Sequence, residues 1–372
     1  MILIAHAFSR RNEGDGLLVD LTMETLRQAG IHTDEFCVLA LDAASFADLP
    51  NVVQAPGEWA ARVTPRLFKA GVEVGLDLLS SMLEPRLALG TVASVARKAR
   101  GIVAVGGGYL VTDSINRQLG VLVNHLIQLR IASRIQAPTV YLPQSVGPLG
   151  GPIGAWVRAK LRGVDRIYVR DAESETELRS SNSRRCPDLA VLKLSRTFSD
   201  IKLKETDPSS TVLVLRDLPN ANGYTSRLIR LIENVSDPVF AVQADVEGPR
   251  GDRAFYGRLR IPSAGSFSEL RKNGPPRVVV SVRLHGAISA LMAGFPAVHL
   301  AYERKGWGAY ADLGLEDYVH DARNFSPDAV AKQVREIQAD PTGFWRRVEN
   351  ACAALREKHD ELVSDLRGRL AN

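Results

Sequence analysis

Short apolar runs alternate with amphipathic stretches along most of the chain, and this alternation predicts strands and helices in turn. The stretches Gly16–Gly30 and Ile115–Ile131 carry apolar residues at helical spacing. The second stretch is long enough for the crossover that two parallel strands require. A shorter helix is expected at Ser174–Arg179. The strands predicted for this half of the chain are Met1–His6, Gly101–Val105, Thr139–Leu142, Arg166–Val169 and Asp188–Val191.

The same alternation resumes after Ser195–Ser210, a polar stretch with one proline and few apolar residues. Such a stretch is typical of a domain boundary. Arg250–Gly265 is basic and is expected to be a solvated loop, although it could also line the rim of a cleft. The strands predicted for the second half are Thr211–Leu215, Pro238–Gln243, Val278–Val282 and Ala297–Ala301, and the helices are Ser226–Val235 and Pro327–Ile337.

The C-terminal segment Thr342–Leu370 repeats apolar residues at spacings of three, four or seven, which predicts one long amphipathic helix. We expect this helix to pack back across both domains. The predicted organisation is therefore an α/β domain over residues 1–195, a second over 208–340, and a C-terminal helix over 341–372. Residues 34–90 predict a helix-rich region with exposed loops, including a helix near Leu67–Met82, and offer no recognisable chemistry.

Composition narrows the class of protein further. The 372 residues are 45% hydrophobic and 24% charged, which allows a substantial core, and the net charge is +5. No run of five or six basic residues occurs, which argues against nucleic-acid binding. Three widely spaced cysteines predict neither a disulfide framework nor a zinc site. The apolar start lacks the basic region of a signal peptide, so a cytoplasmic protein is expected, with attachment to the inner face of the membrane left open.

Basic side chains follow three of the strands predicted in the second half. Arg216 follows one strand, Arg283 and His285 follow another, and Lys305 follows the next. Ligands of open α/β sheets bind beyond the carboxyl ends of the strands, so these residues predict an anion site. Histidine can gain or lose a proton near neutral pH, which makes His285 a candidate general acid or base. A structural histidine at a helix start is the alternative.

Glycine-rich or polar loops follow the strands of the first half. Gly107 and Gly108 come after one strand, Gln144 and Ser145 after the next, and Arg170 after a third. Glycine at a strand end lets backbone N–H groups approach a ligand closely, although it also simply permits a tight turn. Three such loops on one sheet edge favour a cleft wall. The earlier turn with Gly14 and Asp15 is either a ligand-facing loop or a capped helix start.

Several of these segments together resemble the polysaccharide pyruvyl transferase family. The most specific are the RLHG sequence at Arg283–Gly286, the A-I-x-A-L-x-x-G-x-P pattern at Ala287–Pro296 and the turn Tyr302–Lys305. The remaining matches are GGG at Gly106–Gly108, QSVGP at Gln144–Pro148, RD at Arg170-Asp171, PD at Pro187-Asp188 and the turn Asn12-x-Gly14-Asp15. The matched segments span residues 12–314, most of the chain.

The resemblance implies a GT-B-like fold, in which two Rossmann-type domains face each other across a cleft. It implies transfer of the pyruvyl group of phosphoenolpyruvate onto sugar hydroxyls, usually as a cyclic ketal on an exopolysaccharide or cell-wall glycan precursor. The family's phosphoenolpyruvate contacts map onto Arg216, Arg283, Leu284 through its backbone, and His285, with Lys305 as a further contact. His285 would be the acid or base. The acceptor, a glycan or lipid-linked oligosaccharide, would lie on the side of Gly14, Asp15, Gly107, Gly108, Gln144, Ser145 and Arg170.

The sequence contains no acidic cluster with the spacing of a magnesium site, so neither a metal nor a cofactor is predicted. Two other functions fit the same architecture. One is a glycosyltransferase that uses a nucleotide sugar, because fold alone does not determine the donor. The other is a glycan-binding subunit without catalytic activity. The acceptor sugar, the ketal stereochemistry and the oligomeric state are beyond the sequence.

Overall fold

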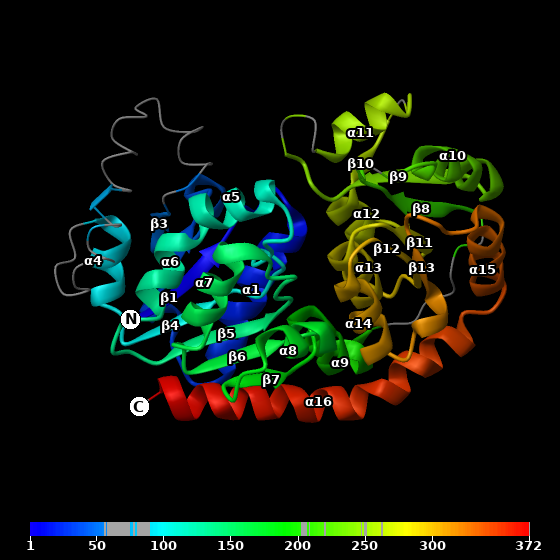
Figure 1. The fold of residues 1–372 in the computed structure, drawn as a ribbon. Helices are drawn as coiled ribbons and strands as arrows, with labels where there is room; N and C mark the ends of the chain where they lie inside the picture. Colours follow the sequence, from blue (N-terminus) through cyan, green and yellow to red (C-terminus); the bar gives the residue numbers. More distant parts are fainter. Residues whose placement is uncertain are drawn as a thin grey trace. The chain divides into compact units, whose positions relative to one another are not determined.

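A computed structural model describes the chain except residues 56, 58–74, 77–78, 80–89, 202–206, 208, 219–220, 247, 249–250, 262 and 372. The described residues form two compact units, each built on a parallel sheet (Figure 1). The first unit comprises residues 1–10, 15–189 and 360–372, and the second comprises residues 11–14 and 190–359.

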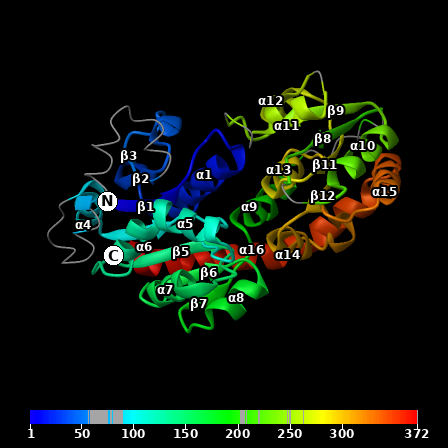
Figure 2. The same ribbon diagram turned by 45° about the horizontal axis from the view of Figure 1, so that its top comes forward.

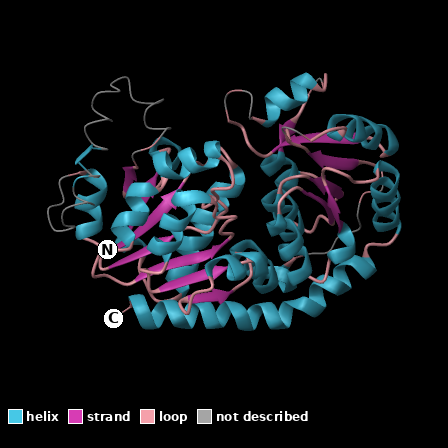
Figure 3. Cartoon of the chain, in the orientation of Figure 1, coloured by secondary structure: helices cyan, strands magenta, loops and turns pink. Residues whose placement is uncertain are grey.

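The sheet of the first unit has seven parallel strands in the order β3-β2-β1-β4-β5-β6-β7. Its strands are β1 (Ile2–Ala7), β2 (Phe36–Ala40), β3 (Val52–Gln54), β4 (Gly101–Ala104), β5 (Thr139–Gln144), β6 (Arg166–Val169) and β7 (Ser183–Arg185). Its helices are α1 (Glu13–Gln28, of which Glu13 and Gly14 group with the second unit), α4 (Thr91–Arg97), α5 (Ile115–Asn124), α6 (Leu126–Ala132), α7 (Gly151–Leu161) and α8 (Ala172–Leu178). Helices enclose the strands, as Figure 3 shows.

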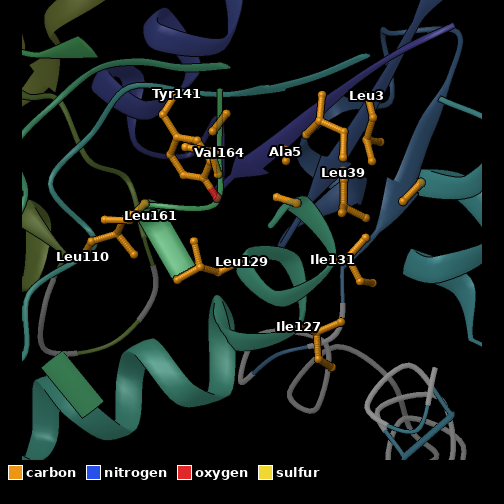
Figure 4. Packing of buried hydrophobic residues seen from close by; sticks show 14 of the residues in the cluster. Leu3, Ala5, Leu39, Leu110, Ile127, Leu129, Ile131, Tyr141, Leu161 and Val164 are labelled. Carbon is orange, nitrogen blue, oxygen red and sulfur yellow. The ribbon is translucent and has the colours of Figure 1, made fainter. Parts of the chain in front are cut away.

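Every second residue of several strands in this unit belongs to one apolar core cluster. Leu3 and Ala5 of β1, Leu39 of β2 and Tyr141 of β5 are all buried in one cluster with residues of α6 (Figure 4). Strands with helices on both faces are buried on both faces, so they appear in the sequence as nearly continuous apolar runs. The burial pattern of β1 agrees, since all six of its residues are buried.

The second unit contains a six-stranded parallel sheet in the order β10-β9-β8-β11-β12-β13. Its strands are β8 (Thr211–Val214), β9 (Pro238–Val242), β10 (Gly265–Ser266), β11 (Val278–Ser281), β12 (Ala297–Ala301) and β13 (Val319–Asp321). Its helices are α9 (Leu189–Thr197, whose first residue groups with the first unit), α10 (Tyr224–Asn234), α11 (Asp252–Arg258), α12 (Phe267–Asn273), α13 (Leu284–Met292), α14 (Arg304–Asp312) and α15 (Pro327–Ala339). Figure 2 shows α13 beside β11 and β12.

The long C-terminal helix is confirmed as α16 (Thr342–Leu370). Its apolar stripe is buried, including Phe344, Val348 and Leu366. Residues of α16 through His359 group with the second unit and those from Asp360 onward group with the first. None of the helices among the described residues is long and apolar enough to cross a membrane.

Four sequence-based predictions of secondary structure are wrong. The predicted strand at Asp188–Val191 is the start of α9, and the region after residue 34 contains strands β2 and β3 rather than helices alone. The predicted loop Arg250–Gly265 contains α11, where Phe255 and Tyr256 are buried against the sheet. The helix predicted at Ile115–Ile131 breaks at His125, between α5 and α6. The helix predicted near Leu67–Met82 lies mostly outside the described residues.

Candidate functional site

The basic residues expected at three strand ends lie at one edge of the second sheet. Strands β8, β11 and β12 are neighbours, and Ser281 of β11 is in register with Val214 of β8 and His299 of β12. Arg216 is two positions after Val214, and Arg283 is two positions after Ser281. The two arginines therefore lie at equivalent distances beyond the paired ends of their strands. The site therefore occupies the carboxyl edge of the sheet, where ligands of open α/β sheets bind.

The guanidinium of Arg283 is held by Asp252, a residue that the sequence did not single out. Nε of Arg283 lies 3.1 Å from both carboxylate oxygens of Asp252, and Nη2 bonds Oδ1 of the same carboxylate. A guanidinium has five N–H donors in a fixed plane, and this pairing uses the edge formed by Nε and Nη2. Asp252 therefore orients Arg283.

Asp252 is fixed in its turn by the backbone. Its side chain is fully buried and its Oδ2 accepts N–H groups from Gln243 at 3.1 Å and Ala244 at 2.8 Å, just beyond β9. A buried carboxylate is stable only when it is paired and hydrogen-bonded, as here. The sequence signal that could have found it is the apolar pair Phe255 and Tyr256, which marks the predicted loop as a packed helix starting at Asp252.

Arg216 is oriented by tyrosines. Its Nη1 donates to the hydroxyl of Tyr302, whose ring lies 4.8 Å from the guanidinium carbon. The hydroxyl of Tyr224 donates to the backbone oxygen of Arg216 at 2.9 Å. Lys305, in the first turn of α14, forms an ion pair of 2.7 Å with Glu303. Three cationic side chains thus follow neighbouring strands of the sheet, and each has a specific partner.

His285 occupies the first turn of α13, directly after Arg283 and Leu284. Its ring lies against the backbone of Gly14, where an added Cβ atom would come within 3.0 Å of Nδ1. The segment with Gly14 is attached to the end of β9, because Glu13 donates its N–H to the Gln243 oxygen at 3.1 Å. Gly14, which was expected on the acceptor side, therefore lies beside His285, and a side chain at this position would displace the imidazole.

A second histidine lies beneath the site. His299 on β12 is buried, and its Nδ1 lies 2.8 Å from the backbone oxygen of Ser281. Burial is the main cause that lowers the pKa of His299 to about 4; the hydrogen bond with the Ser281 oxygen acts in the opposite direction, and Lys305 and His285 nearby contribute to the lowering. At neutral pH the ring is therefore uncharged and adds no repulsion to a site that already contains several cationic groups.

This shift predicts how stability depends on pH. An unfolded histidine has a pKa of about 6.5, so between that pH and about 4 the unfolded chain binds a proton at His299 that the folded chain does not. The contribution of His299 to the free energy of unfolding is therefore fully present above pH 6.5 and is lost as the pH falls. At pH 5 the loss from this residue is about 2 kcal/mol. Urea unfolding of wild type and His299→Gln at pH 7.5 and pH 5 measures it. An equal loss in both proteins would contradict the assignment.

The residues expected on the acceptor side of the first unit form a buried network. Arg170 is 2% exposed and forms an ion pair with buried Asp188, and its Nη2 donates to the Gly107 oxygen at 2.9 Å. Its Nε donates to Oγ of Ser145 at 3.0 Å, and Ser145 donates to Asp171 at 2.5 Å. The network ties together the loops after β4, β5 and β6. It explains the RD and PD motifs as the two halves of one buried ion pair.

The other expected residues of this side have separate environments. Gln144, the last residue of β5, is fully buried, and neither its amide nitrogen nor its amide oxygen has a hydrogen-bond partner among the described residues. Gly108 is exposed and Gly107 is half-buried, and a Cβ atom at Gly107 would lie 2.9 Å from the ring of Tyr109. Asp15 is half-buried in the first turn of α1.

Within the described part of the chain, no group of three or more His, Cys, Asp or Glu side chains is arranged to hold a metal ion.

Comparison with known families decides the classification. The family model described as polysaccharide pyruvyl transferase matches residues 12–304, which includes Arg216, Arg283, Leu284 and His285. The chain belongs to the polysaccharide pyruvyl transferase family. Lys305 lies one residue beyond the matched segment. No sequence among the curated proteins is similar enough to count as a match.

Solved structures support the fold of this family member. HepE (Alr3699) from Anabaena, crystallised with UDP-glucose, is 11% identical, with a TM-score of 0.51 over 100% of this chain and 97% of that chain. MnaA from S. aureus, in a structure with UDP, is 10% identical, with a TM-score of 0.50 over 100% and 96% of the two chains. At this identity the similarity concerns the fold alone, and it confirms the GT-B-like α/β architecture with its long C-terminal helix.

Proposed function

We propose that this polysaccharide pyruvyl transferase family member uses phosphoenolpyruvate as its donor and forms a pyruvate ketal on a glycan precursor. The observation that carries the proposal is the set of Arg216, Arg283 and Lys305 at three neighbouring strand ends, with His285 among them. Phosphoenolpyruvate carries a carboxylate and a phosphate close together, and arginine forks with a lysine point charge suit both groups.

The chemistry assigns a role to each side chain. His285 donates a proton to the methylene carbon of phosphoenolpyruvate, and a sugar hydroxyl attacks C2, forms a C–O bond and returns its proton to the imidazole. The bond between C2 and the phosphate oxygen breaks with its electron pair on the phosphate, a second hydroxyl attacks C2 and completes the ketal, and its proton leaves with the phosphate. Arg216, Arg283 and Lys305 offset the negative charge that develops on the departing phosphate. The step requires no redox partner, and the proposal includes neither a metal nor a cofactor.

The donor can be tested without knowing the acceptor. A ligand that binds only the folded protein at about 100 times its Kd adds about 2.7 kcal/mol of stability. We expect phosphoenolpyruvate to raise the Tm of wild type and not that of a variant carrying Arg216→Met. UDP-glucose and GDP-mannose should leave both unchanged. A stabilisation by nucleotide sugars alone would identify the alternative, a GT-B glycosyltransferase.

The remaining alternative is a glycan-binding subunit without catalytic activity. The orientation of Arg283 by Asp252 and of Arg216 by Tyr302 argues against it, because both pairs preorganise charge at one sheet edge. Phosphate release from phosphoenolpyruvate in the presence of lipid-linked oligosaccharides separates the two functions. A binding subunit would retain the oligosaccharide and release no phosphate.

The proposed acceptor is a lipid-linked or other glycan precursor, and the proposed location is the cytoplasm with contact at the inner membrane face. Ile115, Leu119 and Val123 support this contact, since they are exposed and follow one another at four-residue intervals along α5. Such an apolar stripe suits shallow contact with lipid. Co-sedimentation with anionic vesicles should fall when Leu119→Ser and Val123→Ser are combined. Equal sedimentation of wild type and the double variant would show that this stripe does not contact the membrane.

A further inference from the structure

The carboxyl edge of the first sheet contains a buried polar cluster that the proposed donor chemistry does not use. Its members are His6 at the end of β1, Tyr109 after β4, Tyr141 on β5 and His125 between α5 and α6. Both histidines are at least 94% buried, since His6 is 3% and His125 is 6% exposed. Ligands of open α/β sheets bind at this edge, so the cluster lies where a second ligand is expected.

The two imidazoles and one phenol form a continuous hydrogen-bonded chain. Nδ1 of His6 lies 3.1 Å from Nδ1 of His125, and Nε2 of His6 lies 3.0 Å from the hydroxyl of Tyr141. The backbone of His6 is in the left-handed region with φ of 64°, and its N–H donates to Oε1 of Gln128 at 2.8 Å. Non-glycine residues in this region are found at functional sites, where neighbouring contacts hold them in place.

The ring of Tyr109 fixes the orientation of both imidazoles. It stacks on His6 with centroids 5.0 Å apart and on His125 with centroids 4.6 Å apart. The two imidazole centroids are only 5.2 Å apart, which places both on the same face of the phenol ring. The hydroxyl of Tyr109 donates to the oxygen of Val105 at 3.0 Å, so the stack is anchored to the end of β4.

Both imidazoles are uncharged at neutral pH. Burial lowers the pKa of His125 to about 4, and burial together with the neighbouring His125 lowers the pKa of His6 well below its ordinary value. A neutral imidazole carries one N–H, on either Nδ1 or Nε2. The contact between the two Nδ1 atoms therefore needs one donor and one acceptor, and the tautomers of the two rings are coupled.

Tyr141 determines which of the two arrangements is stable. Its side chain is fully buried, and Nε2 of His6 is the hydrogen-bond partner of its hydroxyl in the described structure. A buried O–H without an acceptor is costly, so the hydroxyl donates to Nε2 of His6. His6 must then carry its proton on Nδ1 and donate it to Nδ1 of His125. His125 is left with its own proton on Nε2.

We propose that the Nε2–H of His125 is the hydrogen-bond donor of a binding subsite for an uncharged oxygen, such as a hydroxyl of a sugar acceptor. A neutral donor suits a hydroxyl or ether oxygen, whereas the cationic edge of the second sheet suits anions. Within the part of the chain that the structure describes, the charged group that acts on Tyr109 is Arg170, and its charge is balanced by Asp188. Among the described residues none hydrogen-bonds Nε2 of His125, and Gly108 in the adjoining loop is exposed. The identification of the ligand as a sugar acceptor rests on the proposed function. The tautomer of His125 does not, because it follows from the hydrogen bonds of His6 and Tyr141.

The tautomers can be measured directly. In protein labelled with ¹⁵N at its seven histidines, two-bond ring correlations report which nitrogen carries the proton. We expect Nδ1–H for His6 and Nε2–H for His125, each assigned by loss of its signal in a single-residue variant. Tyr141→Phe removes the hydroxyl that determines the direction of the hydrogen bonds. In this variant we expect His125 to populate both its Nδ1–H and its Nε2–H tautomers. A predominant Nδ1–H form of His125 in wild type would overturn the proposal.

Ligand binding is tested on the same sample with a panel of 4-nitrophenyl hexosides. A bound hexoside should shift the Nε2 resonance of His125, and His125→Phe should weaken binding roughly tenfold, as expected for one hydrogen bond. His125→Gln restores an N–H donor and should recover most of the affinity, and Tyr310→Phe, a buried tyrosine in the second unit, controls for lost stability. Affinity for phosphoenolpyruvate should be equal in all four proteins. No hexoside binding to wild type, or equal binding to His125→Phe, would overturn the subsite, whereas failure to bind phosphoenolpyruvate would overturn the proposed donor alone.

Discussion

Replacing His285 with alanine is expected to reduce pyruvyl transfer by about two to four orders of magnitude, the range typical for loss of a general acid. The ring lies in the first turn of α13, next to Arg283 and against Gly14, and no other imidazole in the described second unit occupies this position at the sheet edge. His299 cannot replace it, because it is buried and bonded to the Ser281 backbone. Initial rates of phosphate release with saturating phosphoenolpyruvate measure the effect.

The matched control is His320→Ala. His320 lies on β13 of the same unit, and its Nε2 bonds Oε1 of Gln333 at 2.9 Å. This variant should keep the wild-type rate, while His285→Ala should keep the wild-type affinity for phosphoenolpyruvate within a few fold. Near-normal turnover by His285→Ala would show that another group protonates the methylene carbon.

Replacing Arg283 with alanine is expected to weaken phosphoenolpyruvate binding by about 2 to 5 kcal/mol, as found when a buried charged partner is removed. The structure adds a second consequence that the sequence could not indicate. Asp252 would remain fully buried without its guanidinium, which should lower the free energy of unfolding by about 3 to 5 kcal/mol. Binding by calorimetry and unfolding in urea separate the two effects.

A double variant separates the effect of the unpaired Asp252 charge on stability from the effect of Arg283 on phosphoenolpyruvate binding. Arg283→Ala combined with Asp252→Asn removes both charges, so it should recover part of the stability and none of the affinity. Asp188→Asn is the matched control, since it breaks the buried pair with Arg170 in the other unit and should leave phosphoenolpyruvate binding unchanged. If the double variant bound phosphoenolpyruvate with wild-type affinity, Arg283 would not be part of the binding site.

Much of the architecture follows from the sequence because buried parallel strands are short continuous apolar runs. β1, β8, β11 and β12 were predicted close to their observed bounds. Strand β2 was missed although Phe36–Ala40 is such an apolar run, because the region after residue 34 was predicted to be helix-rich as a whole, and β3 has only three residues, all half-buried. Helix α11 was missed because its basic residues suggested a solvated loop, although Phe255 and Tyr256 are buried. Basic charge indicates solvent only where no apolar face accompanies it.

The candidate site was predictable in part for a similar reason. Residues that directly follow a strand, such as Arg216 and Arg283, are placed by the sheet itself, so their position in the sequence is enough to group them. Asp252 reaches Arg283 across 31 positions of the chain, and only the folded structure brings the two together. The same holds for His6 and His125, which are 119 positions apart.

The proposed function requires that the pyruvyl group come from phosphoenolpyruvate. The most direct measurement incubates the protein with ¹³C-labelled phosphoenolpyruvate and lipid-linked oligosaccharides, and follows both phosphate release and the ketal carbon by NMR. We predict one phosphate for each ketal formed, and neither product with His285→Ala. Consumption of UDP-glucose or GDP-mannose with the same oligosaccharides, without release of phosphate from phosphoenolpyruvate, would show that the donor is a nucleotide sugar instead.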